Sequence, residues 1–199
     1  MSKTGTIQTS ITNTRELLLE VARQLFAKVG VTNTTMNDIA KAAQRGRRTL
    51  YVYFRSKEDV YFAVVEQEME KLLDALEELA ISSEPPQNKL IDYVYTRLDT
   101  IKEIVNQNGT LRADFFSDYK MIEMVRRKMD EKEHILLKKI LQDGLEAGVF
   151  SLSNVDFTAF LVLNSLRGME IPYMKQSVSD KMNDYKEDVV RILFHGLLK

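Results

Sequence analysis

The sequence predicts an all-α protein, and three observations support this fold class. The 199 residues include only three Pro and eight Gly, so few positions oppose a helix. Leu, Glu, Lys, Ala and Met, which are all good helix formers, occur throughout the chain. Apolar residues recur at spacings of three and four, and turn residues separate the segments in which they do so. We expect about nine helices.

The first predicted helix spans 13–29 and has one apolar face. The residues at helical spacing on that face are Leu18, Val21, Ala22, Leu25, Phe26 and Val29. A face of this kind packs on a core, so we expect a small three-helix domain over 13–56. Residues 1–12 are rich in Ser and Thr, and we expect a flexible tail there.

Two short helices joined by a tight turn are predicted next. Thr35 can cap the first of them with its hydroxyl, and Asp38 favours the positive end of the helix dipole. The apolar stripe of this helix consists of Met36, Ile39, Ala40 and Ala43. We expect Gly46 to supply the positive φ of the turn, because glycine adopts it without steric cost.

The second short helix is expected over 47–53, with Leu50 and Phe54 facing the core. Its outer face and the two helix ends then carry Arg45, Arg47, Arg48, Thr49, Tyr51 and Tyr53. Arg can pair with guanine through two hydrogen bonds, Thr can contact a thymine methyl or a phosphate, and Tyr can bond a phosphate. This layout is that of a helix-turn-helix that binds duplex DNA.

The charge distribution favours the same function. Residues 1–57 contain ten Lys or Arg and three Asp or Glu, a net charge of +7, whereas the remaining residues carry −8. A basic domain attracts the phosphate backbone, and an acidic remainder is kept off the duplex. Ordinary solvated surface charge is the alternative, and the concentration of cations on the helix-turn-helix pattern argues against it.

For residues 1–12, an arm that touches DNA is the alternative to a tail.

The same region resembles the TetR family of bacterial transcriptional regulators. That family has Ala-x-x-Leu-Phe followed by Gly, then Thr-x-x-x-Ile-Ala, then Thr-Leu-Tyr-x-Tyr-Phe-x-x-Lys. The matching residues are Ala22, Leu25, Phe26, Gly30, Thr35, Ile39, Ala40, Thr49, Leu50, Tyr51, Tyr53, Phe54 and Lys57. Family members usually have Gly directly after the last Ala of the first short helix, where this chain has Gln44. We include Thr35 among the DNA-binding residues, and we assign Lys57 to a phosphate contact at the start of the next helix.

Residues 57–199 are expected to form a second, regulatory and dimerising helical domain. Ser56 caps its first helix, and the Pro85–Pro86 pair marks the clearest break. The predicted segments are 57–81, a helix after Pro86 to 107, a short segment 111–117, and helices 119–146, 155–169 and 180–198. Pro172 is expected to break the chain between the last two helices.

The last two predicted helices carry apolar residues on more than one face. These residues are Leu161, Val162, Leu166, Val189, Ile192, Leu193, Phe194 and Leu197. They predict an interface with a second copy of the chain, and the resemblance also implies a dimer through a four-helix bundle of these helices. The core of a monomer is the alternative.

The middle helices are the predicted place of a small-molecule pocket, where the resemblance implies that an effector binds. The candidate lining residues are Tyr93, Arg97, Ile101, Phe115, Phe116, Tyr119, Met124, Phe160, Asn164 and Arg167. Their apolar majority indicates a hydrophobic effector held by one polar end. Plain core is the alternative role for the aromatic residues and Met.

Other classes of function are disfavoured. The chain has no Cys, its two histidines, His134 and His195, fall on separate predicted helices, and no phosphate-binding Gly loop or nucleophile elbow occurs. We therefore predict no catalysis, metal or cofactor. No apolar run is long enough to cross a bilayer and the N-terminus lacks the apolar core of a signal peptide, so we expect a cytoplasmic protein without membrane contact.

Together these features predict a ligand-responsive repressor. It binds a palindromic double-stranded DNA operator as a homodimer and leaves the operator when an effector changes the spacing of its two DNA-binding domains. Repression rests on the resemblance alone. The alternative is a helical adaptor that acts through a protein partner and has no small-molecule inducer.

Overall fold

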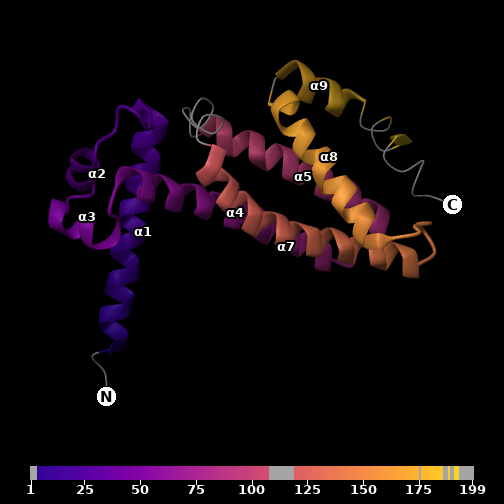
Figure 1. The fold of residues 1–199 in the computed structure, drawn as a ribbon, viewed down its shortest axis with the longest axis horizontal. Helices are drawn as coiled ribbons and strands as arrows, with labels where there is room; N and C mark the ends of the chain where they lie inside the picture. Colours follow the sequence, from indigo (N-terminus) through magenta and orange to yellow (C-terminus); the bar gives the residue numbers. More distant parts are fainter. Residues whose placement is uncertain (1–3, 108–118, 175, 186–187, 189–190, 193–199) are drawn as a thin grey trace. The chain divides into compact units, whose positions relative to one another are not determined.

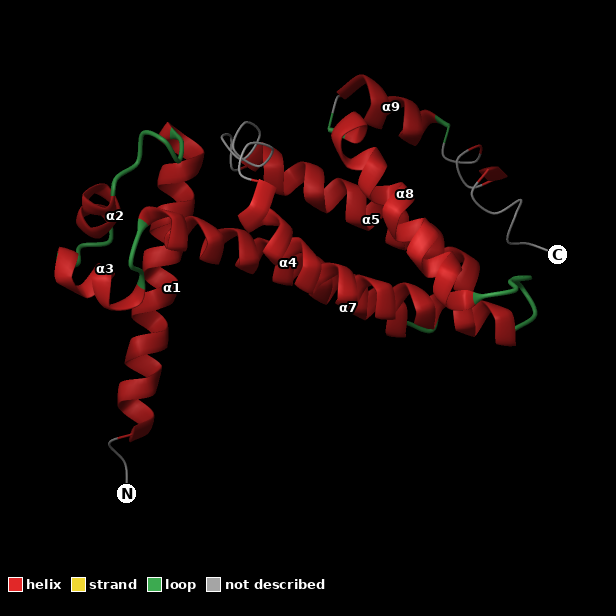
Figure 2. Cartoon of the chain, in the orientation of Figure 1, coloured by secondary structure: helices red, strands yellow, loops and turns green. Residues whose placement is uncertain are grey.

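The computed structural model describes residues 4–107, 119–174, 176–185, 188 and 191–192 (Figure 1). Its helices are α1 (Thr4–Val29), α2 (Met36–Ala42), α3 (Arg47–Tyr53), α4 (Lys57–Ile81), α5 (Pro86–Gln107), α7 (Tyr119–Glu146), α8 (Val155–Tyr173) and α9 (Gln176–Asp184). No strand occurs within the described residues (Figure 2). The predicted all-α class is therefore confirmed. The predicted segment 111–117 lies outside the described residues.

The chain divides into two compact units. Unit 1 contains Met1–Met69 and Ile104–Val125, and unit 2 contains Glu70–Glu103 and Arg126–Lys199. The division passes through α4, so the first half of that helix belongs with α1, α2 and α3. The predicted domain boundary, after residue 56, lies at the start of α4 and therefore before the division at Met69. That boundary stays a prediction.

Helix α1 provides much of the core of unit 1. Leu18, Ala22 and Phe26 of its predicted apolar face are buried, and the ring of Phe26 meets Tyr61 of α4 edge to face at a centroid distance of 6.0 Å. Such aromatic pairs add to the stabilisation that burial provides. Val29 was predicted on the same face but is 44% exposed, because α1 ends there and no further turn covers it.

The start of α1 differs from the prediction. The helix begins at Thr4, whereas the sequence predicts a start near residue 13 and a tail before it. Ser and Thr are only moderately poorer helix formers than Ala. Once 13–29 is helical, each residue added at its N-terminus gains a hydrogen bond without a new nucleation cost.

Helix α2 begins with the predicted cap at Thr35. The Asp38 N–H donates to Thr35 Oγ1 at 3.2 Å, and the Thr35 N–H donates to Asp38 Oδ2 at 2.9 Å. This reciprocal pair is a capping box, which satisfies two donors that the helix itself leaves free. The Thr35 hydroxyl also donates to Asp38 Oδ2 at 2.6 Å. These hydrogen bonds lower the pKa of the Asp38 carboxyl, and the hydrogen bond from the Thr35 hydroxyl has the largest effect.

The turn between α2 and α3 corrects the expectation for Gly46. Gln44 has a φ of 53°, whereas Gly46 has a φ of −67° and lies in the extended region. The Gln44 N–H bonds to the Lys41 carbonyl at 3.1 Å and the Arg45 N–H to the Ala40 carbonyl at 2.9 Å. This is the Schellman arrangement, which needs its left-handed residue directly after the helix end. That position is Gln44. The presence of a glycine at position 46 therefore predicts the wrong residue for the positive φ.

Unit 2 contains the second half of α4, most of α5 and α7, and α8 and α9. Helix α8 continues to Tyr173 and includes Pro172, so the predicted break there is wrong. A proline in the last turn removes one donor, but the Met174 N–H still bonds to the Glu170 carbonyl at 3.1 Å. Helix α9 follows at once, earlier than the predicted start at residue 180.

The left-handed backbone at Gln44 leads to a stability prediction. A non-glycine residue in this region costs about 1–2 kcal/mol, so Gln44→Gly is expected to raise the free energy of unfolding by about 1 kcal/mol. Gly46→Ala is the matched control, because its φ is allowed and a Cβ there meets only Thr49 Oγ1, at 3.9 Å. Urea denaturation of the full chain measures both. Destabilisation by Gln44→Gly together with a large loss for Gly46→Ala would contradict this turn.

Candidate nucleic-acid interface

The outer face of α3 lies opposite the side of the helix that packs on the core. Leu50 and Phe54 are buried, which leaves one exposed face. We call Arg47, Arg48, Tyr51, Val52 and Arg55 the α3 outer face; all five are exposed. Arg47, Arg48, Tyr51 and Val52 lie on one side of α3 at helical spacing, and Arg55 follows directly after Phe54, the extended residue that ends the helix.

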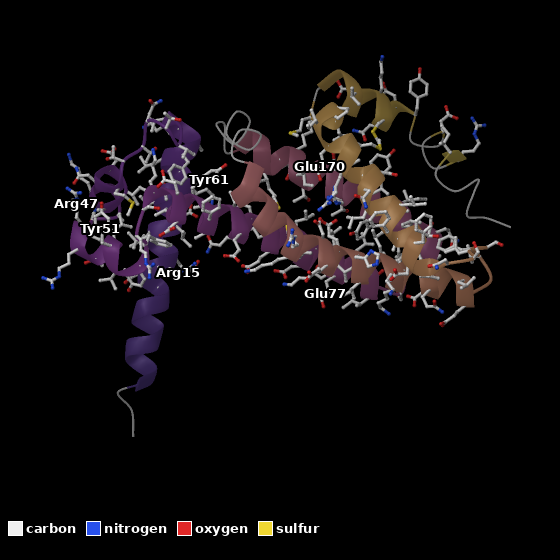
Figure 3. All side chains as sticks on the ribbon, viewed as in Figure 1. Arg15, Arg47, Tyr51, Tyr61, Glu77 and Glu170 are labelled. Atoms are coloured by element: carbon white, nitrogen blue, oxygen red, sulfur yellow. The ribbon has the colours of Figure 1, made fainter. Side chains whose placement is uncertain are left out.

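The cations near α3 are open to a partner from outside. Among the described residues, Arg45, Arg47, Arg48 and Arg55 form no ion pair with a carboxylate. The Arg47 guanidinium lies 5.8 Å from the centroid of the Tyr51 ring, and Figure 3 labels both on the same side of unit 1. A cation over an aromatic ring is partly held in place without losing its charge. These guanidinium groups are available for phosphates and base edges.

The structure brings most of the predicted DNA-binding residues to this region. Arg45 is exposed in the turn, and its Nη1 donates to the Gln44 carbonyl at 3.3 Å. Thr49 and Tyr53 are half-buried at the edge of the α3 outer face. Thr35 is exposed at the start of α2, where its hydroxyl already donates to Asp38. Its accessible role is therefore mainly that of a helix cap.

Lys57 has a role in the structure that the sequence does not predict. Its Nζ donates to the Val31 carbonyl at 2.8 Å and to the Thr32 carbonyl at 3.3 Å. These bonds tie the start of α4 to the loop between α1 and α2. An ammonium group has three donors, so two of them are used inside unit 1 and one remains for a phosphate.

Val52 and Arg55 complete the α3 outer face, although neither belongs to the predicted DNA-binding set. The sequence holds a signal for Val52, because it lies four residues after Arg48 in the same predicted helix. The predicted DNA-binding set omits Val52 because it is apolar, and it omits Arg55 because this residue follows the predicted end of the helix.

The residues proposed for a pocket fall into separate groups in unit 2. Tyr93, Arg97 and Ile101 are buried. Phe160 and Asn164 are exposed on α8 in the single chain, and their place in a pocket lining stays a prediction. Arg167 forms an ion pair with Asp130 of α7. Phe115 and Phe116, and the side chains of Tyr119 and Met124, lie outside the described residues.

Arg97 is the centre of a buried ionic cluster. Its Nε donates to Glu133 of α7 at 2.5 Å, and its Nη2 donates to Glu170 of α8 at 2.9 Å. The hydroxyl of Tyr93 donates to Glu133 at 3.1 Å. Burial alone disfavours the charge on Arg97, but Glu133 and Glu170 outweigh that effect and raise the pKa of Arg97. The cluster therefore joins α5, α7 and α8 through charged groups.

The residues predicted to form the dimer interface also differ in their exposure to solvent. Leu166 is 2% exposed within one chain, so it belongs to the core of unit 2 and its assignment to an interface is wrong. Val162 is half-buried, whereas Leu161 and Ile192 are exposed. Val189, Leu193, Phe194 and Leu197 lie outside the described residues. We call the exposed apolar residues of α8 the α8 apolar stripe; they are Phe157, Phe160, Leu161 and Ile171.

Two other kinds of site are absent from the described residues. Within them, no helix combines the length and the apolar character that crossing a membrane requires. The same residues contain no cluster of three or more His, Cys, Asp or Glu side chains arranged to hold a metal ion.

Comparison with known proteins shows a similarity over the helix-turn-helix region. Residues 18–64 match the family model described as bacterial regulatory proteins, tetR family. That range begins in α1, includes α2 and α3, and ends in the first part of α4.

Individual relatives are similar over nearly the whole chain. The transcriptional regulator QacR of Staphylococcus aureus is 22% identical, and the match covers 94% of this chain and 100% of QacR. A transcriptional regulator from Cytophaga hutchinsonii has the same fold, with a TM-score of 0.78, 22% identity, and coverage of 92% and 98%. A third structure is the complex of SmeT with triclosan, with a TM-score of 0.66, 20% identity, and coverage of 94% and 92%. SmeT is described as the repressor of a Stenotrophomonas maltophilia multidrug efflux pump.

The contacts of Lys57 lead to a prediction about stability in the absence of DNA. Lys57→Ala is expected to lower the free energy of unfolding by about 1–2 kcal/mol, because two charge-assisted hydrogen bonds are lost at a half-buried site. Denaturant unfolding of the full chain measures this. Lys41→Ala, which removes an exposed lysine of α2, is expected to change it by less than about 0.5 kcal/mol. Equal stability of the two variants would contradict the role of Lys57.

Proposed function

We propose that this chain is a transcriptional repressor of the TetR family of bacterial regulatory proteins, whose family model matches residues 18–64. In this proposal two copies bind a palindromic operator together. The family and the similar proteins are transcriptional regulators and not enzymes. A regulator that binds bacterial DNA acts in the cytoplasm, and we propose that localisation.

The α3 outer face carries this proposal. It presents three arginines without carboxylate partners among the described residues, together with a tyrosine and a valine. Arginine and tyrosine suit phosphates and guanine, and an apolar side chain suits a thymine methyl. The major groove of B-DNA is wide enough to admit a helix of this kind.

The dimer rests on the α8 apolar stripe and on the geometry of an operator. Phe157 and Phe160 stack at a centroid distance of 6.3 Å, and Leu161 continues the stripe. A contiguous exposed apolar surface favours an interface. A two-fold dimer then sets two α3 helices in successive major grooves, roughly 34 Å or a multiple apart, which requires a palindromic site.

We also propose a small hydrophobic effector that binds in unit 2 and releases the operator. The complex of SmeT with triclosan is an analogy for the binding of a small hydrophobic effector. The repressor role of SmeT is an analogy for repression. Within unit 2, Nη1 of Arg97 is buried and has no hydrogen-bond partner among the described residues, so it is suited to hold the polar end of a ligand. Helix α4 belongs to both units, so it is a continuous route for the signal.

Selection of bound duplexes from a random DNA pool tests the function. The purified protein is expected to enrich an inverted repeat, and anisotropy titration of that duplex at two salt concentrations is expected to give a steep dependence on salt. Absence of any enriched sequence would contradict the proposal and favour the adaptor.

Two arginines of the α3 outer face are expected to determine affinity. Arg47→Ala or Arg48→Ala should weaken binding to the selected operator by about 1–3 kcal/mol and relax specificity at one position, because a bidentate contact with a base is lost. Arg127→Ala, which removes an exposed arginine of α7, is the control of equal charge and should have little effect. Anisotropy titration measures all three, and equal affinities would show that α3 does not dock as proposed.

The dimer has its own test. Leu161→Glu introduces a charge into the α8 apolar stripe, and we expect it to convert a dimer into a monomer in sedimentation velocity, because a charge without a partner is costly to bury. Ile135→Glu changes an exposed isoleucine of α7 that lies outside the stripe, and it should remain dimeric. A dimeric Leu161→Glu variant would exclude this surface as the interface.

A further inference from the structure

Val52 is an apolar side chain in the middle of a cationic surface. It is 75% exposed, whereas Leu50, two residues before it, is fully buried. Arg48 and Arg55 are exposed on the same outer face. Single exposed apolar residues are common on proteins, but this one lies on the surface that the proposed function directs into DNA.

Local structure gives no reason for a valine at this position. An exposed β-branched residue loses side-chain freedom in a helix and is a poorer helix former than Ala. With most of its surface in water, Val52 gains little from burial within one chain. A larger stabilisation from this side chain therefore requires a contact outside the chain.

The major groove offers one apolar group to such a residue. Guanine, cytosine and adenine present hydrogen-bond donors and acceptors there, and thymine presents O4 together with its 5-methyl group. A valine placed on the polar edges would remove water from them without replacing its hydrogen bonds, which is unfavourable. Against the thymine methyl, it buries apolar surface on both sides.

We propose that Val52 contacts the 5-methyl group of one thymine in each half of the operator and thereby specifies that base. The inference rests on the proposed DNA-binding function and adds the base that this residue selects. Val52 and Arg48 lie one helical turn apart, about 6 Å along the axis. Base pairs are about 3.4 Å apart, so the thymine is expected within about two base pairs of the base that Arg48 contacts.

Deoxyuridine substitution in the selected operator tests this proposal, because deoxyuridine differs from thymidine only in lacking the 5-methyl group. Each thymine is replaced in turn, in both half-sites together, and the affinity is measured by anisotropy. Loss of one buried methyl is expected to weaken binding about fourfold per half-site, or about 15-fold for the symmetric pair. Exactly one symmetric position should show this loss with the unsubstituted protein.

The same scan with Val52→Ala identifies the residue that makes the contact. This variant should bind the unmodified operator more weakly, and deoxyuridine at the sensitive position should then cost less than twofold. Val29→Ala changes an exposed valine of α1 and should keep both the affinity and the full deoxyuridine effect.

Two results would overturn the inference while the DNA-binding function stands. One is an operator that tolerates deoxyuridine at every position, and the other is a deoxyuridine effect of equal size in the unsubstituted protein and in Val52→Ala. If the protein selects no operator at all, the proposed function fails and this inference fails with it. Retained circular dichroism of Val52→Ala would confirm that the variant is folded in each case.

Discussion

A helix of seven residues is too short to be stable alone in water, so α3 depends on the burial of Leu50 and Phe54. Arg15 of α1 lies over the ring of Phe54, 5.7 Å from its centroid, and adds a contact from the first helix. Gln44 fixes the direction in which the chain leaves α2. The side chains that cannot enter this core are the ones offered to DNA. The functional surface is therefore a consequence of how the small core of unit 1 packs.

Unit 2 is organised by a different interaction. Arg97 joins Glu133 of α7 and Glu170 of α8, and Tyr93 completes the bonding of Glu133. Buried charges are costly unless they are paired, so this cluster favours one arrangement of three helices over others. One face of α8 is held by that arrangement, which leaves the α8 apolar stripe on the other. The cluster therefore distinguishes the residues proposed to bind a second copy from the residues that form the core, whereas hydrophobicity alone does not.

Much of the fold could be predicted because it depends on local chemistry, as at Thr35, where a hydroxyl and a nearby carboxylate define the start of a helix. What could not be predicted depends on contacts between distant parts of the chain. Lys57 bonds to carbonyls in a loop far before it in the sequence, and no short pattern indicates this. Leu166 and Phe160 are both apolar, yet one is buried and the other exposed, because the neighbouring helices decide which face is covered. Gln44 shows the same limit, since its φ is set by where α2 ends.

The central claim is that the α3 outer face enters the major groove in both halves of one operator. Methylation protection tests it directly, because dimethyl sulfate modifies guanine N7, which lies in that groove. The account predicts protected guanines in two symmetric half-sites about one helical turn apart, or a multiple of it. Protection only of adenine N3, which lies in the minor groove, or protection in a single half-site, would contradict it.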